Sequence, residues 1–139
     1  MQYRKTVWLL ILGLPIVASA CDFTNYQQID DTFKFGYSNR RGYTNIYYGE
    51  LGIIPGGCDQ AKWDDSVIVA RGRWRYHGYS WAPQKDSTEE FAYFIITKKT
   101  YSNNAAQELS SGFKGPLSEH YFKVNDPLPG KQFHGTSLW

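Results

Sequence analysis

Apolar residues and small or polar residues alternate in the first half of the chain with the two-residue period of a β-strand. Phe33, Phe35 and Tyr37 occupy every second position, and the same character returns after a glycine-containing turn at residues 39–42. A strand with one buried face produces this alternation, because successive side chains point to opposite sides of a sheet. We therefore predict a β-hairpin over residues 32–48.

Two later segments are apolar at consecutive positions. Residues 67–70 read Val-Ile-Val-Ala, and residues 91–97 are apolar at almost every position. Short continuous apolar runs are typical of strands that are covered on both faces. We predict that these two strands lie at the centre of the sheet, with a short strand over residues 61–63 before them.

Helix signals are confined to the C-terminal third. A pair of asparagines precedes a weak helix candidate over residues 103–111, and Ser118 is a candidate N-cap for a second short helix through Phe122. Prolines and a glycine follow, so residues 126–139 are interpreted as an extended tail.

These elements predict a mainly β or α+β fold, with a small antiparallel sheet of about five or six strands and one or two short C-terminal helices that cover its apolar face. Aromatic residues make up 17% of the chain, and they fit the half-buried surface of a sheet. The predicted organisation is a signal peptide over residues 1–20, a tether over residues 21–31, one β-rich domain over residues 32–125 and the tail.

The first twenty residues have the layout of a secretory signal peptide. Arg4 and Lys5 are followed by apolar residues 7–14, and residues 18–20 read Ala-Ser-Ala, a small-residue cleavage site. Removal of this segment takes away two basic and no acidic residues, so thirteen basic residues then balance thirteen acidic ones. A near-neutral chain gives no indication of a nucleic-acid partner.

Cys21 follows the cleavage site directly, and Cys58 is the other of the two cysteines. In one interpretation residues 18–21 resemble a bacterial lipobox, with Ala18 where leucine is usual, and Cys21 carries lipid that anchors the chain to the cell membrane, on the periplasmic face in a Gram-negative host. In the other, Cys21 and Cys58 form a disulfide in a soluble, secreted protein. The two exclude each other, because a thioether sulfur cannot also form a disulfide, and we favour the lipid anchor.

No pattern in the sequence indicates catalysis. The chain has no nucleophile elbow of the Gly-x-Ser-x-Gly type, no metal-binding spacing of Cys or His, and no phosphate-binding loop. Glu119 and His120 are adjacent, and side chains one residue apart on a helix do not face each other. We therefore predict a protein that is not an enzyme and that has no cofactor or metal.

The one patterned charge beyond the signal peptide is a run of alternating basic residues. Arginines on one face of a strand, beside exposed aromatic residues, favour an anionic ligand or a protein partner. The candidate binding surface consists of Arg71, Arg73, Trp74, Arg75, Tyr76, His77 and Trp81. The competing interpretation is a solvent-facing strand end at which arginine protects a sheet edge.

The order of several short motifs resembles a family of small secreted bacterial lipoproteins that is defined only as a domain of unknown function. The motifs are Ile53-Ile54-Pro55, Trp63-Asp64-Asp65, Tyr93-Phe94-Ile95-Ile96 and Gly115-Pro116-Leu117. The resemblance covers about residues 33–123 and is broken by the aromatic and basic insert at residues 74–90. It implies export, a lipid anchor and a small β-rich domain, and it implies no catalytic residues.

The sequence thus predicts an exported, lipid-anchored cell-envelope protein with a non-catalytic binding domain. One version is a periplasmic immunity or inhibitor protein that acts against a toxin or a lytic enzyme. The alternative from another class is a secreted, disulfide-bonded enzyme whose site the fold assembles from distant residues such as Glu119 and His120.

Overall fold

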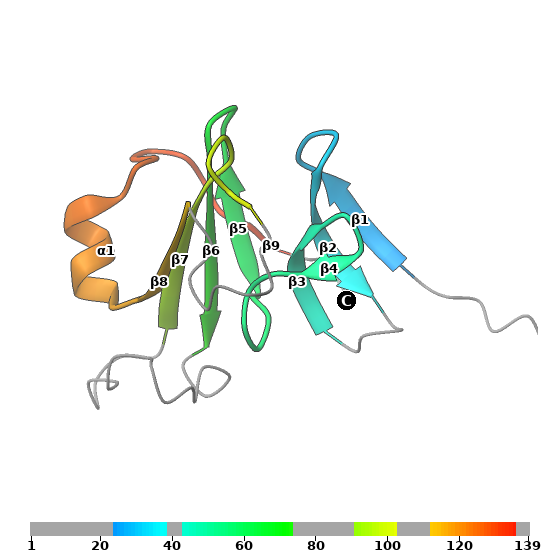
Figure 1. Ribbon diagram of the computed structural model, residues 1–139. Helices are drawn as coiled ribbons and strands as arrows, with labels where there is room; N and C mark the ends of the chain where they lie inside the picture. Colours follow the sequence, from blue (N-terminus) through cyan, green and yellow to red (C-terminus); the bar gives the residue numbers. More distant parts are fainter. Residues whose placement is uncertain (1–23, 39–42, 74–90, 103–111, 136–139) are drawn as a thin grey trace, which may run out of the picture.

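The computed structural model describes residues 24–38, 43–73, 91–102 and 112–135, whose strands form two antiparallel sheets (Figure 1). Sheet A contains, in spatial order, β1 (Thr24–Gln28), β2 (Phe33–Ser38), β3 (Tyr43–Tyr48) and β4 (Leu51–Gly52). Sheet B contains, in spatial order, β8 (Phe113–Leu117), β7 (Phe91–Thr97), β6 (Val67–Arg73), β5 (Gln60–Trp63) and β9 (His134–Gly135). The helix α1 (Glu119–Asn125) follows β8.

The prediction of a mainly β, antiparallel fold with a short C-terminal helix is confirmed. The predicted hairpin is β2 and β3, which pair from Phe33 with Tyr48 to Ser38 with Tyr43. The described part of the chain contains nine strands in two sheets, where the sequence pattern indicated one sheet of five or six.

The main core lies between the two sheets. Phe35 and Ile46 from sheet A pack in one cluster with Ile68 and Phe94 from sheet B, and all four are at most 1% exposed. Burial of such side chains stabilises a domain by about 2 kcal/mol each. The alternation in β2 follows from this arrangement, since Phe33 and Phe35, two positions apart, both pack into this cluster.

A second, smaller core covers the opposite face of sheet B. Val69 and Tyr93 of the sheet pack with Phe122 of α1 and with Leu128 of the segment that follows the helix. Sheet B is therefore the middle layer, with sheet A on one side and α1 with its following segment on the other (Figure 1). This position explains why β6 and β7 are apolar at consecutive residues.

The helix α1 starts where the sequence predicts it. Ser118 is the N-cap, and its Oγ accepts a hydrogen bond of 3.1 Å from the Tyr121 main-chain N–H. Glu119 and Lys123 form an exposed ion pair of 2.9 Å, and Phe122 is buried against sheet B. At seven residues the helix depends on this packing, because isolated helices of such length are unstable in water.

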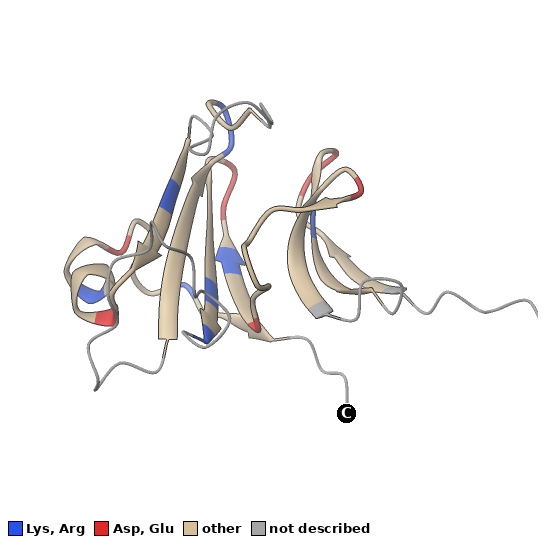
Figure 2. Cartoon of the chain, turned by 60° about the horizontal axis from the view of Figure 1, so that its bottom comes forward, with Lys and Arg blue, Asp and Glu red and all other residues tan. Residues whose placement is uncertain are grey.

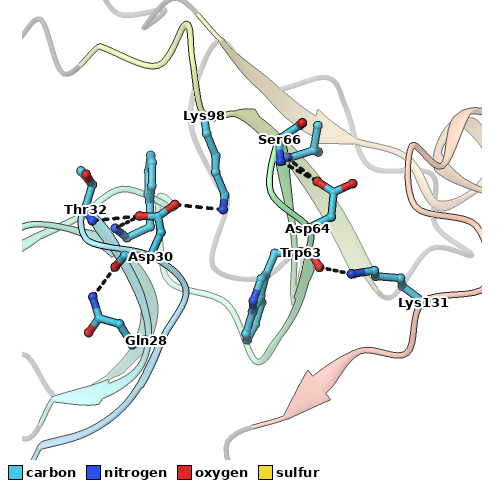
Figure 3. A network of polar contacts seen from close by, with 10 residues as sticks. Gln28, Asp30, Thr32, Trp63, Asp64, Ser66, Lys98 and Lys131 are labelled. Atoms are coloured by element: carbon cyan, nitrogen blue, oxygen red, sulfur yellow. Dashed lines mark hydrogen bonds and ion pairs between the residues drawn. The ribbon is translucent and has the colours of Figure 1, made fainter.

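Two turns at the same end of the sheets are built alike (Figure 3). The Asp30 carboxylate accepts hydrogen bonds of 2.8 Å from the main-chain N–H groups of Thr32 and Phe33, and Asp64 accepts two from Ser66 and Val67. Those N–H donors hold the pKa of Asp64 below its ordinary value. Because aspartate stabilises turns through such bonds, Asp30 and Asp64 each have a structural role.

Two of the predicted segment boundaries are corrected by the structure. The predicted tether contains β1, which pairs with β2 along its whole length. The predicted tail is part of the domain over residues 126–135: Leu128 is 6% exposed, and β9 pairs with β5 through Gln60 and Gly135. The helix candidate over residues 103–111 lies outside the described residues. Within the described ranges, α1 is much too short to cross a bilayer, and no other helix is found there.

Candidate functional site

The structure describes two residues of the predicted binding surface, Arg71 and Arg73, both in β6. The other predicted residues lie outside the described ranges: Trp74, Arg75, Tyr76, His77, Trp81 and Cys21. The register pairs Arg71 with Tyr93 and Arg73 with Phe91. The two arginines therefore lie on one face of sheet B, the face that α1 covers, as the alternation predicts for that part of the strand.

The position of β6 contradicts the edge-protection interpretation for Arg71. Sheet B has β5 on one side of β6 and β7 on the other, and Arg71 has a partner residue in each, Gln60 and Tyr93. Arg71 is also not fully solvated, because its side chain is 22% exposed. The arginine is therefore held within the sheet.

Arg71 is oriented from three directions. Its guanidinium carbon lies 4.2 Å from the centre of the Phe91 ring, and Tyr93 lies opposite it on the neighbouring strand. Asp59 forms an ion pair at 3.9 Å, which is too long for a hydrogen bond, so Arg71 Nε and Asp59 Oδ1 have no hydrogen-bond partner within the described residues. The guanidinium group is thus fixed in place by stacking more than by its charge partner.

Lys62 is the second cation on this face, and it is 3% exposed. Its ammonium group contacts Asp126 at 2.5 Å and the main-chain carbonyl of Leu128 at 2.9 Å. It also lies 4.9 Å from the centre of the Phe133 ring. All of these partners come from the segment after α1, so Lys62 binds that segment to sheet B.

Aromatic rings connect the two cations. Phe133 lies between them, with the Arg71 guanidinium 5.6 Å from its centre. Tyr93 stacks on Phe122 at 4.2 Å with nearly parallel planes. Burial raises the pKa of Tyr93, the charge of Glu119 raises it further, and Arg71 opposes both effects.

We call this arrangement the cation–aromatic row. It consists of Lys62, Arg71, Arg73, Phe91, Tyr93, Phe122 and Phe133. At one end of the row, Lys62 is buried and forms an ion pair with Asp126. At the other end Arg73 is exposed, with its guanidinium 5.9 Å from the Phe91 ring. Stacked arginine and aromatic side chains of this kind bind carboxylates and anionic surfaces.

Sequence reasoning missed five members of the row. Phe133 lies in the predicted tail and Phe122 in a helix that was not linked to the arginines, while Phe91 and Tyr93 were assigned to the sheet centre. Lys62 was taken as part of a short strand. The sequence did contain one usable signal. Lys62 and Arg71 are each flanked by apolar or small residues, and in a strand those flanking side chains point to the face opposite the cation.

Charges are distributed unevenly over the described residues (Figure 2). The strands carry basic residues and no acidic ones, and the acidic residues lie in turns, in loops and at the ends of α1. The basic strand residues are Lys34, Lys62, Arg71, Arg73 and Lys114. The sheets thus present positive charge, even though the whole chain is close to neutral.

Candidate catalytic groups among the described residues are buried in the core or in contact with other side chains. Cys58 is a free thiol buried in the core between the sheets, and burial raises its pKa, which disfavours the nucleophilic thiolate. Glu119 pairs with Lys123, and His134 lies against the Trp63 ring at 4.7 Å. Among the described residues, no three His, Cys, Asp or Glu side chains are grouped so that they could hold a metal ion.

Comparison of the chain with protein-family models, with curated proteins and with solved structures found no match. The resemblance to small secreted lipoproteins therefore stays a prediction from the motifs quoted for it.

Proposed function

We propose that this chain is an exported, lipid-anchored cell-envelope protein whose β domain binds an acidic protein surface without catalysing a reaction. The observation that carries the binding role is the exposed end of the cation–aromatic row, where Arg71 and Arg73 lie along the Phe91 ring. A guanidinium group that is already oriented loses less conformational entropy on binding than a free one. Arginine and aromatic residues are also the side chains that dominate binding energy at protein interfaces.

The lipid anchor is supported by the environment of Cys58. The disulfide alternative requires the Cys58 sulfur to be accessible to Cys21, but Cys58 is 5% exposed and packs in the main core. A buried free thiol there is an ordinary apolar side chain. This leaves the Cys21 sulfur available for lipid.

Mass spectrometry of the mature N-terminus tests the anchor. We expect a diacylglyceryl group on Cys21, and we expect the Cys21→Ser chain to move from the membrane fraction to the soluble fraction. Cys58→Ser is the matched control and should stay with the membrane. Detection of a Cys21–Cys58 disulfide would overturn the anchor.

The binding surface is tested with arginine variants that separate binding from folding. Because Arg73 is exposed, Arg73→Ala combined with Arg75→Ala should weaken capture of the envelope partner about tenfold or more, with a nearly unchanged thermal midpoint. Lys114→Ala removes an exposed charge from β8 and should leave capture unchanged. Equal loss of capture in the Lys114 variant would show that only net charge matters.

Arg71 requires separate treatment, because its side chain is a packing element as well as a charge. Arg71→Ala removes the stacking on Phe91 and the contact with Phe133, so it should lower stability by about 1–2 kcal/mol. A loss of binding in that variant is interpretable only beside its unfolding curve. Arg71→Lys keeps the charge without the planar stack, so we expect it to retain part of the stability and little of the binding.

A further inference from the structure

Among the strands that the structure describes, the two sheets have four edges, and three of these carry features that prevent pairing with another strand. The strands β4 and β9 are two residues long. The strand β8 contains Lys114 and Pro116, and its register shifts between Tyr93 and Ile95. Short edge strands, lysine, proline and bulges are the means by which proteins block edge-to-edge association.

The fourth edge, β1, carries none of these features. Its residues read Thr-Asn-Tyr-Gln-Gln, so the strand is uncharged, and its pairing with β2 is regular over all five positions. Asn25, Gln27 and Gln28 are exposed. The strand is therefore long enough and regular enough to accept another strand.

The main-chain hydrogen bonds between β1 and β2 alternate along the strand, and this alternation shows which groups of β1 are directed away from sheet A. Ile29 donates its N–H to the carbonyl of Phe33 in β2 at 3.0 Å. The main-chain groups of an antiparallel strand alternate in direction, so the odd-numbered residues face β2 and Tyr26 and Gln28 face outward. The surroundings of Gly36 in β2 fit this alternation. A Cβ at Gly36 would overlap the Asn25 carbonyl oxygen, so the main chain of this odd-numbered residue is directed toward β2.

The outward groups of β1 are complementary to those of a second copy. When two copies of β1 run antiparallel about Tyr26, Tyr26 pairs with Tyr26 and Thr24 with Gln28, which are all residues with outward main-chain groups. Asn25 then lies opposite Gln27. Every cross-strand pair in this register is uncharged, so no repulsion opposes it.

We propose that β1 is a self-association edge, at which a second copy of this chain extends sheet A by antiparallel pairing centred on Tyr26. This goes beyond the proposed binding role and uses a different surface. It does not depend on the lipid anchor. An edge of five residues buries much less surface than a standard protein interface, so the dimer in solution is weak and depends on concentration.

Cysteine cross-linking in the full chain tests the register. The parent chain carries Cys21→Ser, so its remaining native cysteine is the buried Cys58. Variants with Asn25→Cys or Gln27→Cys should give no dimer alone under mild oxidation, and an equal mixture of the two should give a disulfide dimer. The two positions are opposed in the proposed register at the close spacing of a pair without mutual hydrogen bonds.

Substitution at Gln28 tests the main-chain contacts. Gln28→Pro removes an outward N–H from each copy and should weaken dimerisation about thirtyfold in sedimentation equilibrium, since two hydrogen bonds are lost. Gln28→Ala keeps the N–H and should dimerise like the parent. Because neither change affects a bond to β2, both variants should unfold at about the same temperature as the parent.

Three outcomes would overturn the proposal. The first is a monomer at all concentrations, together with no disulfide in the mixed sample. The second is a dimer that Gln28→Pro leaves intact, which would locate the interface elsewhere. The third is cross-linking of Asn25→Cys with itself, which would show a different register.

Discussion

Lys62 shows how a buried cation can hold together parts of the chain that are far apart in the sequence. Asp126 neutralises it from a position 64 residues later. Because the Lys62 side chain is 4% exposed, Asp126→Asn leaves a buried charge without its counter-ion. We expect this change to lower the free energy of unfolding by about 3 kcal/mol, as measured by denaturant titration.

The matched control for that variant is an ion pair on the surface. Glu119→Gln breaks the exposed contact with Lys123 on α1 and should change stability by about 0.5 kcal/mol or less. A double change of Lys62→Met and Asp126→Leu should recover part of the stability lost in Asp126→Asn, because no buried charge then remains. Similar losses in the two single variants would mean that Lys62 is effectively solvated.

Asp30 links stability to pH. Burial raises its pKa, but hydrogen bonds from Lys98 and from the main chain of Phe33 and Thr32 outweigh burial and hold it below the ordinary value. A carboxyl group with a lowered pKa in the folded state stabilises the fold above its unfolded pKa, and this contribution is lost as the pH falls through the folded pKa. We expect Asp30→Asn to cost about 1 kcal/mol at neutral pH and to reduce the loss of stability below about pH 4. Parallel pH–unfolding curves for Asp30→Asn and the parent would contradict this, and Asp31→Asn, at an exposed neighbour, is the control.

Local chemistry could be predicted for single residues when the signal lay within a few positions. The Ser118 cap was of this kind, because the cap and its N–H partner are near neighbours in sequence. The Lys62 site could not be predicted in this way. The segment that follows α1 brings the partners of Lys62 to it. The residues around Lys62, 60–64, show no pattern that predicts where that segment runs.

At the scale of elements, the pairing of β1 with β2 depends on one glycine. A Cβ at Gly36 would overlap the main chain at Asn25 and Tyr26, which cannot move aside as a flexible side chain can. Gly36→Ala should therefore cost about 2–3 kcal/mol and should speed amide hydrogen exchange in β1 more than in β6. Ser38→Ala, at the next position on the same face of β2, should have a smaller effect and leave exchange in β1 unchanged. Uniform acceleration in both strands would mean that β1 is not a separate unit.

Strands were predictable where a buried face imposed a pattern. The alternation of β2 and the continuous apolar runs of β6 and β7 each reflect one or two covered faces. The strands β1 and β9 were missed for a physical reason. The first is polar throughout and lies at an edge, and the second is two exposed residues that pair with β5 through the main chain.

At the scale of the molecule, sheet B is the layer on which everything else packs. The sequence indicated that β6 and β7 are covered twice, and it correctly suggested α1 as one cover. It could not show that residues 24–52 form a separate sheet that covers the other face, because the pattern of a half-buried strand is the same in one sheet or in two. The same holds for the candidate site. The alternating arginines could be recognised in the sequence, but the buried end of the cation–aromatic row at Lys62 could not.

The segment after α1 gives the sharpest test of this architecture. A chain that ends at Asn125 loses both acceptors of Lys62, the buried Leu128 and the Phe133 ring between the two cations. Each loss costs about 2 kcal/mol or more, and together they approach the whole stability of a small domain. We expect this chain to be unfolded or to melt at least about 15 °C lower by circular dichroism. A chain that ends at Gly135 keeps every one of these contacts, so it is the control and should melt well above the chain that ends at Asn125. Equal midpoints for the two truncations would show that the segment is the loose tail indicated by its prolines, and that the second core of sheet B contributes little to the fold.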